Sequence, residues 1–159
     1  RERYNTQAEL LENAHEFRKR KLPVDVIVQD WQWWGKYGWN AMQFGESKYP
    51  DPGKMVRELH NMNIHLMLSV WSKIDKQSAL GKQMESKGFY IPGTDWIDFF
   101  NPDAAAFYWH NFSSKLLKPY KIDAWWQDAT EPENDDLLNR RINNGKLRVN
   151  STAMFIRFL

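Results

Sequence analysis

The sequence repeats one pattern: an amphipathic helical segment, a short connection, and then a short apolar segment that ends at a chemically distinctive residue. The first copy begins with Thr6-Gln7-Ala8-Glu9, a capping box, followed by apolar residues at helical spacing. Pro23 ends this predicted helix, and residues 24–29 form a run rich in β-branched side chains that is typical of a strand. Asp30 follows that run directly.

The second copy is built in the same way. Asp51 followed by Pro52 predicts a helix start, with a capping carboxylate and Pro at the first helical position. The predicted apolar face of this helix consists of Met55, Leu59 and Met62. The apolar run of residues 64–70 then predicts a second strand, and Trp71 follows it.

The third part of the chain repeats the pattern less regularly. We expect a weaker helix over about 75–87, ended by Gly88, and a short strand over 96–100. Asn101-Pro102-Asp103 predicts the start of another helix, and 122–127 predicts a last strand that ends at Asp128. The residues expected to face inward on that helix are Ala105, Trp109, Phe112 and Leu116.

Strands that alternate with helices indicate a parallel sheet, either an open doubly wound sheet or a (β/α)₈ barrel. The expected strands are almost continuously apolar, as strands covered on both faces are. No Gly-rich phosphate turn follows any of them, which disfavours a nucleotide-binding open sheet. Acidic and aromatic residues at the strand ends favour the barrel, whose active site lies there. Because a full barrel needs ~250 residues, we predict an α/β fold that is a partial (β/α)₈ TIM barrel of about three to four parallel strands with flanking helices.

Composition excludes several classes of function. The net charge of +2 is too small to indicate a nucleic-acid partner, and the basic run of residues 18–21 is interpreted as a solvated helix end. No apolar run reaches the ~18 residues of a membrane span, so no membrane partner is expected. No apolar segment follows Arg1–Tyr4, so no signal peptide is expected, and a bacterial cytoplasm and a periplasm are both compatible with the sequence.

Aromatic residues are abundant, with nine Trp, nine Phe and six Tyr. Trp faces stack on sugar rings, and a carboxylate flanked by aromatic residues at a strand end suits carbohydrate chemistry. Asp128, preceded by Trp125 and Trp126, could serve as the nucleophile of a retaining glycosidase, or it could cap the turn that follows. Asp30 could bind sugar hydroxyls or simply start a loop, and Trp71 could line a sugar site or belong to the core.

The remaining ionisable residues suggest no further site. The acidic residues that follow Asp128 are interpreted as a solvated loop, in which Glu131 could orient its neighbours. No His pairs with another His or an acid at metal-ligand spacing on one element, so neither a metal nor another cofactor is expected. With these residues in view, four segments taken in order resemble glycoside hydrolase family 31. They are 17–30, Lys48–Met55 with Phe44, Phe99–Pro102, and Trp125–Pro132, which resembles the nucleophile motif hydrophobic-Trp-x-Asp-x-x-Glu-Pro.

The resemblance implies a retaining α-glycosidase that acts on terminal α-linked sugars. The amino-acid sequence around Asp128 is most similar to that of bacterial α-xylosidases. It implies that Asp128 is the nucleophile that forms the covalent glycosyl-enzyme, and that Asp30 binds substrate hydroxyls. It implies that Trp71 and Trp126 are walls of the sugar site, and that Glu131 neighbours the nucleophile. The expected substrate is an oligosaccharide or another α-glycoside, either an α-xyloside or an α-glucoside.

The chain also departs from the family. The family's acid/base is an Asp on a later strand, so no residue here is expected to fill that role, and we expect the chain alone to have little or no activity. The resemblance covers residues 1–148, while 149–159 do not resemble the family and are interpreted as a possible frameshifted tail. Two alternative functions are kept: a non-catalytic carbohydrate-binding remnant, and an open-sheet α/β metabolic enzyme.

Overall fold

The computed structural model describes residues 3–128, 137 and 139–148, and these form two compact units. Unit 1 contains the chain up to Tyr37, together with Met42–Val70 and Phe112–Trp126. Unit 2 contains Gly38–Ala41, Trp71–Asn111 and the described residues from Gln127 onward. The predicted tail, 149–159, lies outside the described residues.

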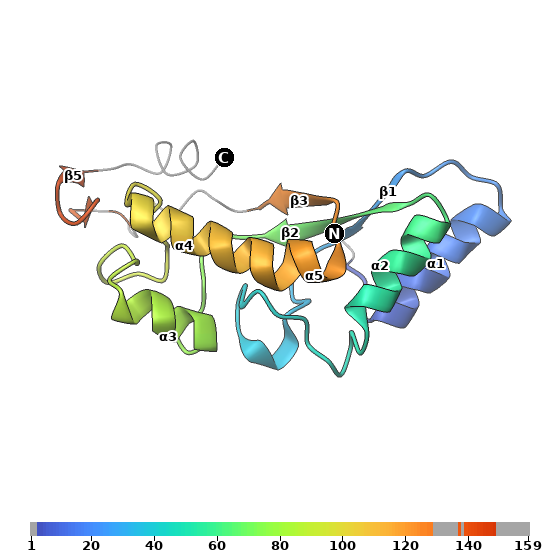
Figure 1. Ribbon diagram of the computed structural model, residues 1–159, viewed down its shortest axis with the longest axis horizontal. Helices are drawn as coiled ribbons and strands as arrows, with labels where there is room; N and C mark the ends of the chain where they lie inside the picture. Colours follow the sequence, from blue (N-terminus) through green and yellow to red (C-terminus); the bar gives the residue numbers. More distant parts are fainter. Residues whose placement is uncertain (1–2, 129–136, 138, 149–159) are drawn as a thin grey trace. The chain divides into compact units, whose positions relative to one another are not determined.

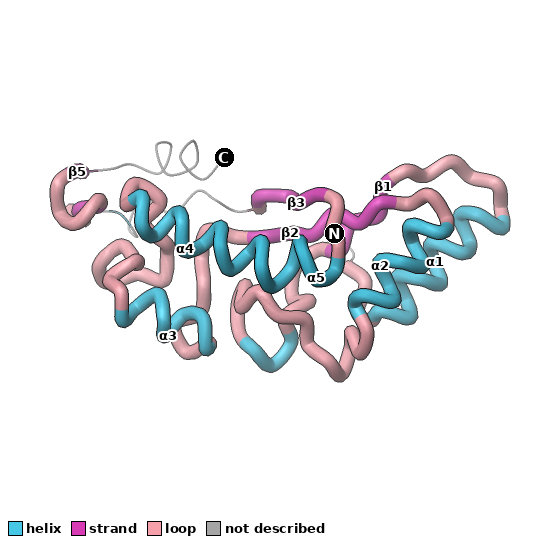
Figure 2. Tube along the Cα trace, viewed as in Figure 1, coloured by secondary structure: helices cyan, strands magenta, loops and turns pink. Residues whose placement is uncertain are grey.

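A three-stranded parallel sheet is the centre of unit 1 (Figure 2). Its strands are β1 (Val26–Gln29), β2 (His65–Val70) and β3 (Ala124–Gln127), in the order β1-β2-β3. β1 and β2 pair in register from Val26 opposite His65 to Gln29 opposite Leu68. The parallel sheet and the alternation of helix and strand confirm the predicted fold class.

Two helices of unit 1, α1 (Gln7–Lys19) and α2 (Pro52–Asn61), pack side by side (Figure 1). The predicted caps are present, because Thr6 Oγ1 accepts from Glu9 N–H at 3.1 Å and Asp51 Oδ1 accepts from Lys54 N–H at 2.8 Å. The apolar faces of these helices and the sheet form the core of the unit. Fully buried members of that core include Leu10, Ala14, Met55, Leu59, Leu66 and Leu68.

The basic helix end does more than face solvent. The guanidinium of Arg18 donates to the carbonyl oxygens of Val24 at 2.8 Å, Met62 at 2.8 Å and Asn63 at 3.1 Å. Val24 lies in the connection before β1, and Met62 and Asn63 lie in the connection before β2. Arg18 therefore joins the two connections that lead into the sheet, because one planar donor group satisfies carbonyls from both.

A long helical stretch precedes β3 in the chain: α4 (Pro102–Phe112), the π-helical segment η2 (Ser113–Leu117) and the short α5 (Lys118–Tyr120). The π-helical character is explicit in the backbone, since Lys118 N–H donates to Ser113 C=O, five residues earlier. Lys121, with φ of 55°, ends the stretch in the left-handed conformation. Phe112 and Leu116 are buried as predicted.

The predicted inward face of α4 is wrong in its first half. Trp109 is 49% exposed, and the buried residues are Ala104 and Tyr108 instead of Ala105 and Trp109. Helical spacing from Ala105 to Phe112 and Leu116 placed Trp109 on the inward face. Tyr108 is nevertheless buried, because its hydroxyl reaches a backbone carbonyl and so carries no unpaired polar group into the interior.

Unit 2 contains α3 (Ala79–Ser86) and the two-stranded hairpin of β4 (Arg141–Ile142) and β5 (Leu147–Arg148). The helix expected over 75–87 begins only at Ala79, because Ser78 caps it by accepting from Gly81 N–H at 2.9 Å. Gly88, with φ of 67°, follows the helix as predicted. One cluster of this unit's core consists of Ile91, Trp96, Leu137 and Ile142, with Phe100 packed against it.

The strand expected over 96–100 is not formed. Only single-residue bridges occur there, Lys73 with Trp96 and Tyr90 with Ile97. The backbone turns immediately afterward, because Asn101 N–H donates to Asp98 C=O at 3.0 Å. No helix among the described residues is long and apolar enough to cross a membrane.

Candidate active site

Asp30 follows the last residue of β1 and is half-buried. Its Oδ1 accepts from the backbone N–H of Trp31 at 2.7 Å, which fixes the carboxylate at the start of the loop. The buried side chain of Gln29 supports the same point, because its Nε2 donates to Asp30 C=O at 2.9 Å and to Tyr4 C=O at 3.2 Å. The carboxylate therefore extends from a backbone that is held on both sides.

Trp125 and Trp126 lie in the middle of β3 and point to opposite faces of the strand, as successive strand residues do. The ring of Trp125 meets Phe112, at the end of α4, with 5.5 Å between centroids in an edge-to-face arrangement. That contact assigns Trp125 to the helix-covered face. Trp126, which is 43% exposed, therefore lies on the other face, which is the interior face in a barrel.

Trp71 follows the last residue of β2 and belongs to unit 2. Its backbone carbonyl accepts from Asn40 Nδ2 at 2.7 Å and from Tyr108 Oη at 2.7 Å. Its ring meets Trp39 edge to face, with 4.9 Å between centroids. The indole Nε1–H of Trp71 is buried and has no hydrogen-bond partner among the described residues.

Asp128 follows the last residue of β3 and is half-buried. It is assigned to unit 2 with Trp71, whereas Asp30 and Trp126 belong to unit 1. Glu131, the fifth predicted site residue, lies outside the described residues. Asp30, Trp71 and Asp128 thus share one local feature, since each is the first residue after a strand of the parallel sheet.

Asn40 and Tyr108 were not predicted, although both support Trp71. Asn40 is buried in the left-handed region, with φ of 53°, and its Nδ2 also lies 3.4 Å from Tyr108 Oη. Burial raises the pKa of Tyr108, so its hydroxyl keeps its proton and remains a donor. Helical periodicity would have predicted Tyr108 to be buried if the buried face of α4 had been placed one residue earlier in the sequence, at Ala104 and Tyr108.

The side chains at the strand ends can bind a ligand that combines hydroxyl groups with apolar ring faces, as a sugar does. Asp30 and Asp128 supply carboxylates, and Trp71 and Trp126 supply apolar faces of the kind that pack against sugars. A group suited to metal binding, His60, His65 and Asp123, lies at the other, amino-terminal ends of β2 and β3. Asp30, Trp71 and Asp128 follow the carboxyl-terminal ends of the strands and so lie at the opposite strand ends from this group.

Comparison with known proteins identifies the family. The family model described as "Glycosyl hydrolases family 31 TIM-barrel domain" matches residues 1–153. The chain is 44% identical over 133 residues to an α-xylosidase of Saccharolobus solfataricus, covering 84% of the chain and 18% of the relative. It is 35% identical over 144 residues to an uncharacterized family 31 glucosidase of Pseudescherichia vulneris, covering 82% of the chain and 27% of the relative.

Solved structures agree with these relatives. A family 31 α-xylosidase from a soil metagenome, solved with xylose, is similar with a TM-score of 0.83 and 30% identity, over 98% of this chain and 24% of that protein. The family 31 α-xylosidase of Xanthomonas citri is similar with a TM-score of 0.75 and 34% identity, over 82% of this chain and 16% of that protein. The chain thus spans about a quarter or less of these proteins. The barrel, and not the open sheet, is the correct architecture, and the chain belongs to glycoside hydrolase family 31, as part of its TIM-barrel domain.

Proposed function

We propose that this chain is the nucleophile-bearing part of a retaining α-glycosidase, one that removes terminal α-linked xylose or glucose. Asp128 attacks the anomeric carbon and forms the covalent glycosyl-enzyme, which water then hydrolyses. The observation that carries the proposal is the position of Asp30, Trp71 and Asp128. Each directly follows a strand of the parallel sheet, and the carboxyl ends of the strands are where TIM barrels build their active sites.

The other site residues bind the sugar. Asp30 accepts hydrogen bonds from substrate hydroxyls, because its carboxylate extends from a backbone that Gln29 and Trp31 N–H hold in place. Trp126 offers an exposed aromatic face on the side of β3 away from Phe112. We assign the ring of Trp71 to a wall of the sugar site and Glu131 to the neighbourhood of the nucleophile.

The second carboxyl group of the mechanism comes from outside this chain. A general acid must protonate the leaving oxygen from the side opposite the nucleophile, and in the retaining mechanism the same group later activates water. The chain alone is therefore expected to show little or no turnover of aryl α-glycosides. Its contribution is the nucleophile and one part of the sugar site.

A chimera tests the assignment. This chain replaces the matching segment of the Saccharolobus solfataricus α-xylosidase, which restores the rest of the domain. The chimera is expected to hydrolyse an aryl α-xyloside, and Asp128→Ala is expected to lower kcat by on the order of a thousandfold or more. Asp103→Asn, an exposed carboxylate in the first turn of α4, is the matched control and leaves kcat unchanged.

Azide rescue distinguishes a nucleophile from a carboxylate that only supports the fold. In Asp128→Ala, azide can enter from the face that Asp128 vacates, attack the anomeric carbon and displace the aryl group, so the product is the β-glycosyl azide. Formation of that azide supports the assignment. A folded Asp128→Ala chimera that retains full turnover without azide would remove Asp128 from the mechanism.

A further inference from the structure

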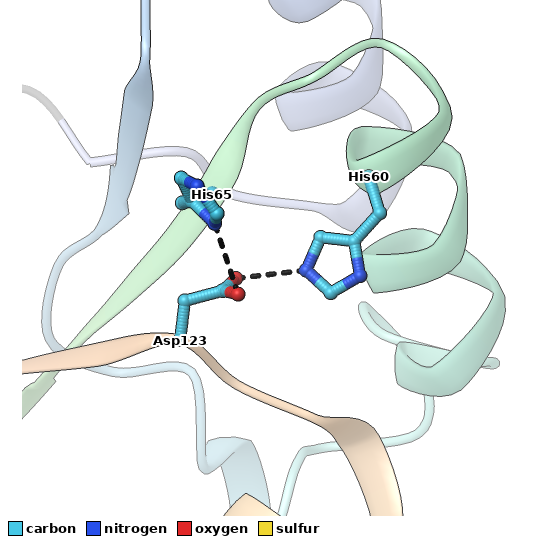
Figure 3. A group of neighbouring side chains, drawn as sticks. All are labelled: His60, His65 and Asp123. Carbon is cyan, nitrogen blue, oxygen red and sulfur yellow. Dashed lines mark hydrogen bonds and ion pairs between the residues drawn. The ribbon is translucent and has the colours of Figure 1, made fainter.

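Three side chains from separate elements of unit 1 meet around one carboxylate. His60 Nε2 lies 2.9 Å from Asp123 Oδ2, and His65 Nδ1 lies 3.0 Å from Asp123 Oδ1 (Figure 3). His60 is in the last turn of α2, His65 is the first residue of β2, and Asp123 directly precedes β3. One ligand atom from each residue lies within 4.8 Å of the other two.

The carboxylate at the centre of this group is anchored by the backbone. Asp123 Oδ2 also accepts from Leu66 N–H at 2.9 Å, and Asp123 N–H donates to Leu66 C=O at 3.2 Å. These two bonds tie the residue before β3 to the edge of β2. The anchoring matters because a ligand that the backbone already orients loses less freedom when it binds an ion.

The group is also accessible. The side chain of His65 is 63% exposed, that of His60 is 33% exposed and that of Asp123 is 22% exposed. All three line one surface pocket together with Asn63 and Ile64. An ion can therefore reach the ligand atoms from solvent.

We propose that His60, His65 and Asp123 form a binding site for a divalent transition-metal ion, with Zn²⁺ as the ion of best fit. Two imidazole nitrogens and one carboxylate oxygen form the donor set of many three-ligand zinc sites, in which a water completes the tetrahedron. In such a site, ligand atoms at about 2.0–2.2 Å from the metal lie roughly 3.3 Å from one another. Asp123 presents Oδ2 to His60 at 2.9 Å and Oδ1 to His65 at 3.0 Å, and one ligand atom from each residue lies within 4.8 Å of the other two. An ion that joins all three therefore requires the two imidazoles to draw together around the carboxylate.

The donor set selects against the common hard cations. Mg²⁺ and Ca²⁺ prefer cages of oxygen ligands, and this group offers one carboxylate against two imidazoles. Zn²⁺, Ni²⁺ and Cu²⁺ accept imidazole readily. The two histidine rings are 6.2 Å apart between centroids, and the His65 side chain is exposed, so its ring has room to turn toward a shared ion.

The site lies at the amino-terminal ends of β2 and β3, whereas the proposed catalytic residues follow the carboxyl-terminal ends of the strands. In TIM barrels the amino-terminal face serves stability, and the carboxyl-terminal face serves catalysis. An ion bound here joins the end of α2 to the start of two neighbouring strands. Because the ion binds the folded state, it is expected to raise the melting temperature, and the rise continues with the logarithm of the free ion concentration above the dissociation constant.

A metal titration of the purified chain tests the proposal. Bound metal is first removed from the protein with a chelator. ZnCl₂ is then added at a pH at which imidazole is neutral, and the heat of binding and the melting temperature of the protein are measured. One Zn²⁺ per chain and a higher melting temperature are expected. His65→Gln removes one ligand at an exposed position and is expected to weaken binding by on the order of ten- to a hundredfold or more.

His15→Gln is the matched control. His15 Nε2 also pairs with a carboxylate, Glu58, at 2.8 Å, and it is 56% exposed, but no third ligand joins the pair among the described residues. This change is expected to leave the Zn²⁺ affinity unchanged. Co²⁺ provides a second measurement, since its paramagnetism is expected to broaden the proton resonances of the His60 and His65 rings far more than those of the His15 ring.

The outcomes separate a metal site from an ordinary ion pair. Zn²⁺ binding that His65→Gln and His60→Gln both weaken, while His15→Gln does not, supports the site. Absence of saturable Zn²⁺ binding, or binding that all three variants retain at full affinity, overturns the proposal and leaves a hydrogen-bonded Asp123 between two histidines. Melting curves of each metal-free variant show whether a lost affinity comes from a lost fold.

Discussion

The hydroxyl of Tyr108 donates a 2.7 Å hydrogen bond to the backbone carbonyl of Trp71, directly after β2. A second donor, Asn40 Nδ2, reaches the same carbonyl at 2.7 Å. Both donors are buried, so water does not compete for the acceptor. The backbone of Trp71 is therefore held by side chains from two other segments of unit 2, which limits where the Trp71 ring can lie.

Tyr108→Phe is expected to lower the free energy of unfolding by about 0.5–1.5 kcal/mol. The Trp71 carbonyl keeps the Asn40 donor, so no acceptor is left wholly unsatisfied. Urea unfolding of the chain measures the change. Tyr37→Phe, at a position outside this contact, is the control and is expected to stay within about 0.5 kcal/mol. Equal losses in both variants would show that the Trp71 carbonyl gains nothing from Tyr108.

Trp71→Phe separates a role in the fold from a role in binding. The change removes a buried N–H that has no partner among the described residues, so stability is expected to change by only about 1 kcal/mol. If the Trp71 ring is a wall of the sugar site, the smaller Phe ring lowers kcat/KM of the chimera by about tenfold, equivalent to about 1.4 kcal/mol. Trp109→Phe, on the exposed side of α4, is expected to leave kcat/KM unchanged. A large loss of stability without a change in kcat/KM would assign Trp71 to the core.

Gly81→Ala is expected to destabilise unit 2 by about 1–3 kcal/mol. A Cβ at this position would lie 2.0 Å from the carbonyl oxygen of Asp75 and 2.8 Å from the Cα of Lys76. Both contacts are with backbone, which cannot rotate away as a side chain can, so α3 must shift. Thermal unfolding of the variants measures the change. Lys82→Ala, at the exposed neighbouring position on the same helix, is the control and is expected to have little effect on stability. Tolerance of Gly81→Ala without a loss of stability would contradict this close approach.

The stability of unit 2 is expected to depend on Asp98 in the acid range. Burial raises the pKa of Asp98, and the N–H groups of Asn143 and Phe100, which donate to it, offset this only in part. The pKa of Asp98 is higher in the folded than in the unfolded protein. Protonated Asp98 therefore contributes its full stabilisation below the ordinary Asp pKa of about 4, and this contribution is lost as pH rises through the raised pKa.

Asp98→Asn isolates this contribution, because the amide does not titrate. Urea unfolding of both proteins across the acid range gives the difference in the free energy of unfolding, in which the other carboxylates cancel. The wild-type protein is expected to lose stability relative to Asp98→Asn as pH rises through the window. A difference that moves in the opposite direction would mean that the backbone hydrogen bonds outweigh burial.

Sequence patterns were sufficient where local chemistry decides the structure. Thr6 and Asp51 cap the helices that they were expected to cap, because a capping oxygen needs only an N–H three residues away. Asp30, Trp71 and Asp128 were expected to follow strands because the apolar runs end there, and they do. Their assignment as catalytic or sugar-binding residues is still a prediction.

Patterns were insufficient where distant segments decide the structure. Asn40 adopts a left-handed backbone conformation. Its side chain contacts Trp71, 31 positions later in the chain, and Tyr108, 68 positions later, and no local sequence rule detects such contacts. His60 and His65 were not expected to bind a metal, because ligand spacing was sought within one element, whereas the fold brings them together with Asp123 from three segments. The strand expected over 96–100 failed because its pairing partners supply only single bridges.

The wide turn of η2 takes up one residue without changing which way the following chain faces. Its Lys118-to-Ser113 bond spans one residue more than an α-helical bond, so the segment in effect carries an extra residue within the helix. Because the wider turn absorbs that residue, deleting one residue from Ser113–Leu117 would let the helix rewind in the α form and would leave the phase of the chain beyond nearly unchanged. A regular α-helix that kept the extra residue would instead turn that chain by about 100°, the angle per residue of an α-helix. The loose winding of one turn thus preserves the facing of β3, and with it the direction in which Trp126 points.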